Sequence, residues 1–338
     1  MILNEIPVKT TNNFNINDLK IDLIVPTNLE YRKFITKNIE DIDIKYSEIE
    51  NITSKIGLDL PKALNIDITI DKKIVKPIEL TYEFKENDNL IDNININCKS
   101  GSSANIIIKY ISSGTNTNFH HLKQLINLEN DSNLTITVLN LLNSKSINLI
   151  ASESTVEKNS TLTQNLFDIG SDIKISNYYS NVLENANSYL NNIYIGKDNN
   201  IIDMNYNYIN KQKKSVTNLV TEGILDNKST KKYRGTIDFI SGASKSIGKE
   251  KENCVLLSDT AISRSVPILL CGEEDVEGAH AVSTGKLEDS KLFYIKSRGI
   301  DEKQAKKMII MSNFNKIVEK INNKETEEEV IEILDSIL

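Results

Sequence analysis

The chain has 338 residues, of which 39% are hydrophobic and 26% charged, and its formal net charge is −7. These values are typical of a folded protein with a sizeable core, and the acidic balance argues against a protein that grips nucleic-acid backbones, because such domains are usually basic. No basic segment followed by an apolar one opens the chain, and no apolar run approaches the length of a bilayer, so we expect a cytoplasmic protein with no nucleic-acid or membrane partner.

The first zone, residues 1–75, mixes polar turns with short helical candidates. Within it, residues 28–42 carry apolar side chains at roughly helical spacing, which predicts a helix there. These side chains are Leu29, Phe34, Ile39 and Ile42. The sequence therefore predicts a short N-terminal α/β appendage.

The second zone, residues 76–285, consists of short apolar or alternating runs separated by turns rich in Asn, Asp and Ser. Alternation places one face of a run inward and the other in water, as in a β-strand. Four turn clusters begin at residues 128, 156, 183 and 225, so their offsets are close to multiples of about 14 residues. Regular short strands suggest a solenoid or a sandwich, and the lack of helix patterns between them favours a β-helix over a doubly wound sheet.

The third zone, residues 286–338, switches to helical spacing. Asp301 with Gln304, and Thr326 with Glu329, have the spacing of capping boxes, which predicts two helices that begin at these positions. Each helix has an apolar stripe, and the stripes either pack on the β core or help to dock a partner. The stripes hold Ala305, Met308, Ile309, Ile317, Val318 and Ile321 in the first helix, and Val330, Ile331, Leu334, Ile337 and Leu338 in the second.

Two stretches look like nucleotide-binding motifs but depart from them. STGK, which ends at Lys286, has His280 where a phosphate loop needs glycine and Leu287 where it needs Ser or Thr. SGASKSIGK (241–249) has Ser246 in place of the middle glycine of a dinucleotide fingerprint, and no βαβ pattern surrounds it. We interpret both as turns, and any nucleotide would belong to a partner.

The histidines and cysteines form no self-contained site in the sequence. His120 and His121 are adjacent and would face opposite sides of a strand, so we expect one packed and one exposed. His280 is either structural or a ligand, and a metal site would need further donors from distant sequence or from a second chain. Cys98, Cys254 and Cys271 fit no disulfide or CxxC frame, and the last two lie in apolar runs, as buried thiols do. No catalytic motif emerges.

The late region resembles a known family. DVEGAHAVSTGKLEDSKLFYIKSRGIDEKQAKKMI (275–309) closely resembles the signature of the SufB/SufD family of iron–sulfur cluster assembly proteins, with its histidine, its Leu-Phe-Tyr and its Ser-Arg-Gly-Ile before a helix. NCVLLSDTAISRSVPILL (253–270) is similar to the family's leucine-rich strand, Ser-Asp turn and Pro-led strand. The resemblance covers about residues 76–321.

This resemblance implies a mainly β protein, with a right-handed parallel β-helix core (76–285) and a C-terminal α-helical segment (286–338) that docks SufC, an ABC-type ATPase. Two such subunits pair through their β-helices, and a cluster forms at their interface. The chain would then be a non-catalytic scaffold. The residues expected to position or contact the ATPase are Leu292, Phe293, Tyr294, Arg298, Gly299, Ile300, Met308, Ile309, Phe314 and Ile317.

Within the family, the chain looks most like SufD. The SufB type usually has Glu after the signature histidine and a cysteine seven residues before the Asp of the next turn, whereas here Ala281 follows His280 and Glu252 stands seven residues before Asp259. His280, with Cys254 near the missing cysteine, is then a candidate for a metal or cluster interface, where a SufB-like partner supplies a thiolate. The resemblance implies no cofactor held stably by this chain alone, with iron or an iron–sulfur cluster present only transiently between subunits.

Two alternatives remain open. The chain is a SufB-like scaffold that works as a homodimer and itself carries the nascent cluster, or, more remotely, a β-helix enzyme that acts on polysaccharide. The enzyme alternative lacks an export signal and a defined cluster of acids on one strand face.

Overall fold

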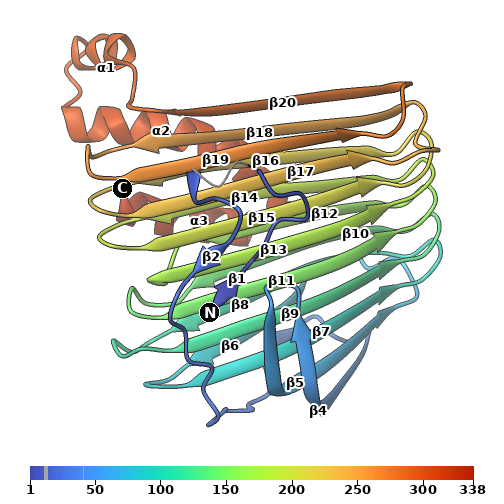
Figure 1. Ribbon diagram of the computed structural model, residues 1–338. Coiled ribbons are helices and arrows are strands. Elements are labelled where there is room, and N and C mark those ends of the chain that lie inside the picture. The colour runs from blue at the N-terminus through green and yellow to red at the C-terminus, as the bar shows by residue number, and fades with distance from the viewer. Residues whose placement is uncertain (11–13, 41) are drawn as a thin grey trace.

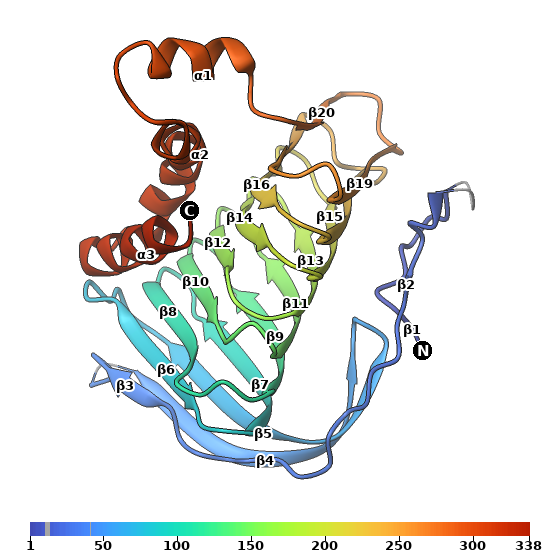
Figure 2. The same ribbon diagram turned by 90° about the vertical axis from the view of Figure 1, so that its left-hand side faces the viewer.

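The computed structural model describes residues 1–10, 14–40 and 42–338. Its strands form a tall stack of coils in which, from β5 to β20, each strand is followed, across a turn, by a strand of the opposite sheet (Figure 1). The helices flank one sheet and the N-terminal segment flanks the other (Figure 2).

The strands are β1 (Ile2–Leu3), β2 (Leu19–Lys20), β3 (Ile35–Lys37), β4 (Asp43–Ser54), β5 (Leu58–Ile70), β6 (Ile78–Phe84), β7 (Asn89–Cys98), β8 (Ser103–Ser112), β9 (Phe119–Leu128), β10 (Asn133–Leu141), β11 (Ile147–Val156), β12 (Thr161–Asp168), β13 (Ile173–Val182), β14 (Asn187–Gly196), β15 (Ile201–Asn210), β16 (Val216–Leu225), β17 (Thr230–Phe239), β18 (Ser246–Leu256), β19 (Ile262–Cys271) and β20 (Val276–Gly285). The helices are α1 (Asp289–Lys296), α2 (Glu302–Val318), the 3-10 helix η2 (Glu319–Ile321) and α3 (Lys324–Ile337).

Two nine-stranded sheets make up the stack. The even sheet runs β20-β18-β16-β14-β12-β10-β8-β6-β3, and the odd sheet runs β19-β17-β15-β13-β11-β9-β7-β5-β4. From β5 to β20, neighbouring strands within each sheet are parallel, and two strands make one coil, which confirms the parallel β-helix.

The repeat length agrees with the spacing of the turn clusters. Asn133 pairs with Thr161 on the next coil, and Thr161 pairs in turn with Asn187 on the coil after that. Each coil contains two turns, so a spacing of about 14 residues corresponds to half a coil. Asn159 and Asn185 adopt positive φ in these turns, which Asn tolerates better than most residues.

Inward-facing side chains stack in columns inside the solenoid. Ile68, Ile96 and Ile126 are register neighbours on β5, β7 and β9, and all three are buried in the main core. Identical spacing between coils lets each apolar side chain pack on the equivalent one in the next coil, so the coils bury one another.

Two smaller cores seal the outer faces of the sheets. Ile317, Val318 and Ile321 of the predicted stripe share a cluster with Ile193 and Ile224 of the even sheet, so this part of the stripe packs on the β core, whereas Met308 is 51% exposed. On the opposite flank, the N-terminal segment packs on the odd sheet. This third cluster includes Leu3, Leu19, Ile52, Leu58, Ile91, Leu149 and Ile175.

The helix boundaries agree in part with the sequence. Asp301 caps α2, and its carboxylate accepts a hydrogen bond from the Gln304 backbone N–H at 3.0 Å, as expected. The second predicted start was wrong, because Asn323 caps α3 by accepting from the Thr326 N–H at 2.9 Å. Thr326 is buried inside the first turn of α3, and α1 is an additional helix that periodicity missed.

The helix predicted at residues 28–42 is absent from the described part of that stretch, and residue 41 lies outside the described residues. Residues 28–34 are irregular, and β3 follows them. The segment bonds to the solenoid instead of to itself: the Glu30 N–H donates to the Asn89 carbonyl oxygen at 2.8 Å, and Arg32 forms an ion pair with Asp88.

His120 and His121 are both fully buried, so the expectation of one exposed ring was wrong. His120 faces the interior, and its Nε2 lies 3.0 Å from Asp92 Oδ1. His121 faces outward, but the β4–β5 hairpin covers it, and its Nε2 lies 2.9 Å from Ser54 Oγ.

The two ends of the stack differ. At the lower end, β3 pairs antiparallel with β6, and β4 pairs antiparallel with β5. At the upper end, β20 and β19 are the outermost strands among the described residues, and each runs parallel to its neighbour in the sheet. None of the helices in the described residues is both long and apolar enough to cross a membrane.

Candidate functional site

His280 lies at the open upper end of the solenoid. It is the register partner of Glu250 on the neighbouring strand, whose side chain is buried in the interior. Gly278, two residues earlier on the same face, points at Leu269 of β19: a Cβ there would lie 2.7 Å from the Leu269 side chain. His280 therefore faces the interior, yet it is exposed because no coil covers it among the described residues.

A buried ion pair lies in the interior of the solenoid, one coil below His280. Lys231 Nζ lies 2.8 Å from Glu252 Oε1, and both side chains are fully inaccessible. Tyr194 donates its hydroxyl proton to the same oxygen at 3.0 Å. Ser265 of the last coil accepts from Lys231 at 2.7 Å and donates to Glu252 Oε2 at 3.1 Å. Both carboxylate oxygens of Glu252 thus accept hydrogen bonds, and the Lys231 ammonium donates to two acceptors.

Glu250 is a second buried acid, close to the Lys231–Glu252 ion pair. Burial raises its pKa to about 7, the nearby Tyr233 hydroxyl opposes this increase, and the charge of Glu252 adds to it. Gly235 makes room for the carboxyl group, because a Cβ there would lie 2.0 Å from Glu250 Oε1. This oxygen has no hydrogen-bond partner among the described residues.

Cys254 is buried on the same inward face as Glu252, as its even spacing predicted. It does not meet His280. Cys254 is level with Thr284, whereas His280 is level with Glu250, four residues earlier, so the two are about 13 Å apart along the strands. Burial also raises the pKa of the Cys254 thiol. No group of three or more His, Cys, Asp or Glu side chains with metal-site geometry occurs within residues 1–10, 14–40 and 42–338.

STGK is a strand and not the predicted turn: Ser283, Thr284 and Gly285 end β20. Lys286, which follows them, forms an ion pair with Asp259 at 2.6 Å. Lys286 therefore has a carboxylate partner within the fold. SGASKSIGK does form a turn, as predicted, before β18 begins at Ser246.

Helix α1 projects from the stack and buries none of its side chains (Figure 1). Phe293 is 74% exposed and Tyr294 is 61% exposed, whereas Leu292 is half-buried. A groove of about 480 Å³ lies between α1 and α2, lined by Tyr294, Ile295 and Ile309 among others. Large exposed aromatic side chains beside a groove are typical of a protein-binding surface.

The Ser-Arg-Gly-Ile stretch ends α1. Gly299 adopts φ +87°, and its N–H donates to the Lys296 carbonyl oxygen at 3.0 Å, as in a glycine helix terminator. The guanidinium of Arg298 stacks over the Tyr294 ring at 5.3 Å. The motif thus fixes the turn from α1 to α2 and the orientation of Tyr294, while Ile300 is half-buried after it.

The candidate docking residues on α2 divide between its two faces. Met308 is 51% exposed and Ile309 is half-buried, so both are within reach of a partner. Phe314 and Ile317 are buried against the even sheet. These two side chains position α2 and present no contact surface while the helix is packed.

Lys231, Glu250 and Glu252 were not found from the sequence, although a signal exists. In the run Lys249-Glu250-Lys251-Glu252, acids alternate with lysines, so on a strand both acids share one face. Two acids on the inward face of a strand, inside an otherwise apolar solenoid, would have indicated a buried polar site in this coil.

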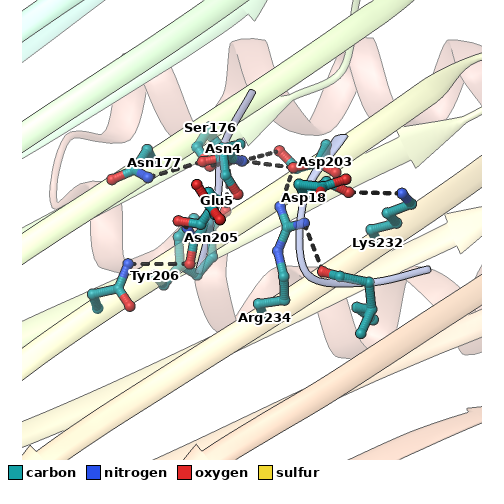
Figure 3. Close-up of polar contacts among 12 residues, drawn as sticks. Asn4, Glu5, Asp18, Ser176, Asn177, Asp203, Asn205, Tyr206, Lys232 and Arg234 are labelled. Atoms are coloured by element: carbon teal, nitrogen blue, oxygen red, sulfur yellow. Dashed lines mark hydrogen bonds and ion pairs between the residues drawn. The ribbon is translucent and has the colours of Figure 1, made fainter. Parts of the chain in front are cut away.

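A second polar cluster also went unnoticed, on the outer face of the odd sheet (Figure 3). Asp203 and Arg234 form a fully buried ion pair there, and Asn4 covers it by donating to Asp203 Oδ1 at 2.6 Å. Outward-facing charges on strands are usually exposed. Only the position of the N-terminal segment, which is remote from both residues in the sequence, explains their burial.

Comparisons with known proteins agree with the fold. The family model of the SUF system FeS cluster assembly, SufBD core domain, matches residues 82–313. The iron–sulfur cluster assembly protein SufD of Bacillus subtilis is 25% identical over 117 residues, which are 35% of this chain and 27% of that protein. SufD of Escherichia coli is 27% identical over 108 residues, 32% of this chain and 26% of that protein.

An iron–sulfur cluster assembly SufBD family protein of Mycobacterium tuberculosis is 41% identical over 68 residues, which are 20% of this chain and 17% of that protein. The matched segments thus span about a quarter or less of these curated relatives.

Proposed function

Because this chain belongs to the SufBD core family of SUF-system iron–sulfur cluster assembly proteins and is most like SufD, we propose that it is a non-catalytic scaffold subunit of a SUF assembly complex. In this proposal its open end pairs with a SufB-like subunit, and α1 and α2 dock a SufC-like ATPase. The observation that carries the proposal is the pair of edge strands, β19 and β20, whose outer edges carry no further strand among the described residues, with His280 exposed between the interior and the solvent.

The upper edge is suited to pairing. Edge strands present free N–H and C=O groups, and soluble proteins usually cover or blunt them. The β20 edge carries the small residues Gly278, Ala279 and Ala281, which allow close approach of another backbone. Pro267 removes one donor from β19, so β20 offers the more complete edge.

His280 gives the paired interface a ligand for its cargo. Neutral imidazole is a borderline ligand for iron, and a partner thiolate would add the soft donor that iron–sulfur clusters require. Glu252 occupies the position where SufB-type chains usually have cysteine, and both of its oxygens are held by Lys231, Tyr194 and Ser265. The missing thiol supports pairing with a SufB-like chain over pairing with a second copy.

The ATPase proposal rests on α1. Its aromatic side chains Phe293 and Tyr294 are largely exposed, and the basic residues Lys291, Lys296 and Arg298 lie beside them in the sequence. Such a surface fits a partner with an apolar pocket and an acidic rim. The burial of α2 and α3 on the even sheet would give this docking helix a rigid base.

Co-expression with a SufB-like subunit and a SufC-like ATPase tests both parts. Replacing Phe293 and Tyr294 together by Ala should remove the ATPase from the purified complex and leave the SufB-like subunit bound. Ile331→Ala, at another partly exposed position on α3, is the matched control and should retain both partners. ATPase retained by the double variant would refute the docking surface.

His280→Ala should leave the paired subunits together and remove the absorbance of the iron–sulfur cluster from the complex. A cluster reconstituted on this chain alone, without any SufB-like subunit, would instead favour the homodimeric scaffold.

A further inference from the structure

The first residues of the chain form a strap, residues 1–10 and 14–20, that crosses the outer face of the odd sheet. Its two short strands, β1 and β2, pair with each other and not with the solenoid. The strap reaches three successive strands, β13, β15 and β17, all of which come from the second half of the chain (Figure 3).

Most hydrogen bonds between the odd sheet and the strap are accepted by backbone oxygens of the strap. Asn205 donates to the carbonyl oxygens of Asn4 and Glu5 at 3.4 and 3.1 Å. Arg234 donates to the Ile16 oxygen at 3.1 Å, and Lys232 donates to the Asp18 oxygen at 2.9 Å. These donors recognise the path of the strap and are largely independent of its side chains.

Asn4 is the exception, because its side chain both donates a hydrogen bond to the sheet and accepts one from it. Its amide nitrogen donates to Asp203 Oδ1 at 2.6 Å, and its amide oxygen accepts from Asn177 at 2.8 Å. Asn4 is fully buried, so neither contact can be replaced by water while the strap is docked. Asn4 is therefore the anchor of the strap.

Docking also has an opposing cost. It removes the Asp203–Arg234 pair from water completely, yet Asp203 Oδ2 and Arg234 Nε have no hydrogen-bond partner among the described residues. A buried charge pair that is incompletely satisfied is weakly stabilising, whereas release of the strap would hydrate it. The hydrogen bonds gained on docking are thus partly offset by the desolvation of the Asp203–Arg234 pair, so the strap can detach without unfolding the rest of the protein.

The strap holds the strand directly beneath the pairing edge. Lys232 and Arg234 of β17 are register partners of Arg264 and Val266 of β19. Among the residues that the structure describes, β19 is the last strand of the odd sheet, and it pairs there with β17. The order of β19 therefore depends on β17, whose outer face the strap fixes.

We propose that the N-terminal strap is a detachable latch that, when docked through Asn4, orders the β17–β19 coil and so prepares the edge for pairing. The role of the edge rests on the proposed function, but the latch itself is a property of the isolated chain. Release would loosen β19 without unfolding the lower coils.

Hydrogen exchange on the isolated full-length chain tests the latch. Asn4→Ala should speed exchange about tenfold at the strap amides and across residues 262–271, with residues 89–168 unchanged. Glu5→Ala is the matched control: its half-exposed carboxylate forms an ion pair with Lys9 at the surface, and its backbone contact to Asn205 remains. Lys232→Ala, which removes one strap contact, should produce a smaller effect in the same two regions.

Faster exchange in the strap alone, with residues 262–271 unchanged, would overturn the coupling, and no change in the strap would overturn Asn4 as its anchor. Neither result depends on a partner. Pairing of the unaltered chain with a SufB-like subunit separately tests the proposed function, and in that assay Asn4→Ala should weaken pairing while Glu5→Ala does not.

Discussion

The burial of His121 makes a quantitative prediction about acid stability. Its ring lies between the odd sheet and the β4–β5 hairpin, with Nε2 bonded to Ser54 and no partner at Nδ1 among the described residues. Burial lowers the pKa of His121 from the ordinary 6.5 to about 3, and the adjacent His120 ring adds to this effect. The folded protein thus keeps the ring neutral under conditions in which the unfolded chain takes up a proton.

The magnitude follows from proton linkage. A base whose folded pKa is depressed contributes stability that is fully present above the unfolded pKa of 6.5 and is lost as pH falls. At pH 5, about 1.5 pH units below that value, protonation favours the unfolded chain by about 2 kcal/mol. At pH 7.5 the effect is close to zero, so the loss begins near the unfolded pKa of 6.5 and continues as pH falls toward the folded pKa of about 3.

His121→Gln removes this titration. We expect the variant to be less stable than the wild type at pH 7.5, but to lose about 2 kcal/mol less unfolding free energy between pH 7.5 and pH 5. Urea denaturation at several pH values measures this difference. Equal losses in the wild type and His121→Gln would refute the reasoning.

Three further predictions concern the interior and the helical flank. Gly223→Ala should lower the free energy of unfolding by about 1–3 kcal/mol in urea melts, because its Cβ would lie 2.2 Å from the Tyr194 ring; an unchanged midpoint would show that the ring can move aside. Burial raises the pKa of Glu250 from 4.5 to about 7, so the contribution of Glu250 to stability should fall as pH rises through this range, opposite in direction to that of His121. Glu250→Gln should remove this contribution, which amounts to up to about 3 kcal/mol; parallel pH curves of the wild type and the variant would contradict this. Glu329→Ala should cost about 1–3 kcal/mol in thermal or urea unfolding, because it leaves the buried Lys109, now 2.5 Å away, without its nearest carboxylate, and a neutral effect would show that water or another acid replaces it.

The coil repeat was predictable because it depends on turn residues and strand alternation that are close together in the sequence. Asn and Asp recur where the backbone must take positive φ, as at Asp131 and Asn159, and alternation marks the strands between them. The cap at Asp301 was predictable for the same reason, since a helix start needs an acceptor for its free N–H groups. These features depend on residues a few positions apart.

Features set by distant contacts were not predictable. Helix α1 has no buried stripe, so periodicity carries no signal for it. Residues 28–34 have helical spacing, but their hydrogen bonds go to Asn89 and Asp88 of the first coils instead of to a helix. The helix-like spacing of the apolar residues arose because this irregular segment packs along several strands of the solenoid.

The site was only partly predictable. His280 could be placed at an exposed position from its small neighbours, but its register with Glu250 depends on how strands of consecutive coils pair. The Asp203–Arg234 pair was hidden for the same physical reason, because the segment that buries it comes from the opposite end of the chain. The residues were visible in the sequence, and their environments were not.

The difference between the two ends of the stack limits how large an assembly this chain can form. At the lower end, β3 is only three residues long, and the outermost strand β4 carries Asp43, Lys45, Glu48 and Glu50, charges that discourage a further strand. At the upper end the edges are open. Pairing through strand edges is therefore favoured at the upper end alone, and two solenoids joined there would leave only the short β3 and the charged β4 as outer edges, which disfavour growth into a fibre.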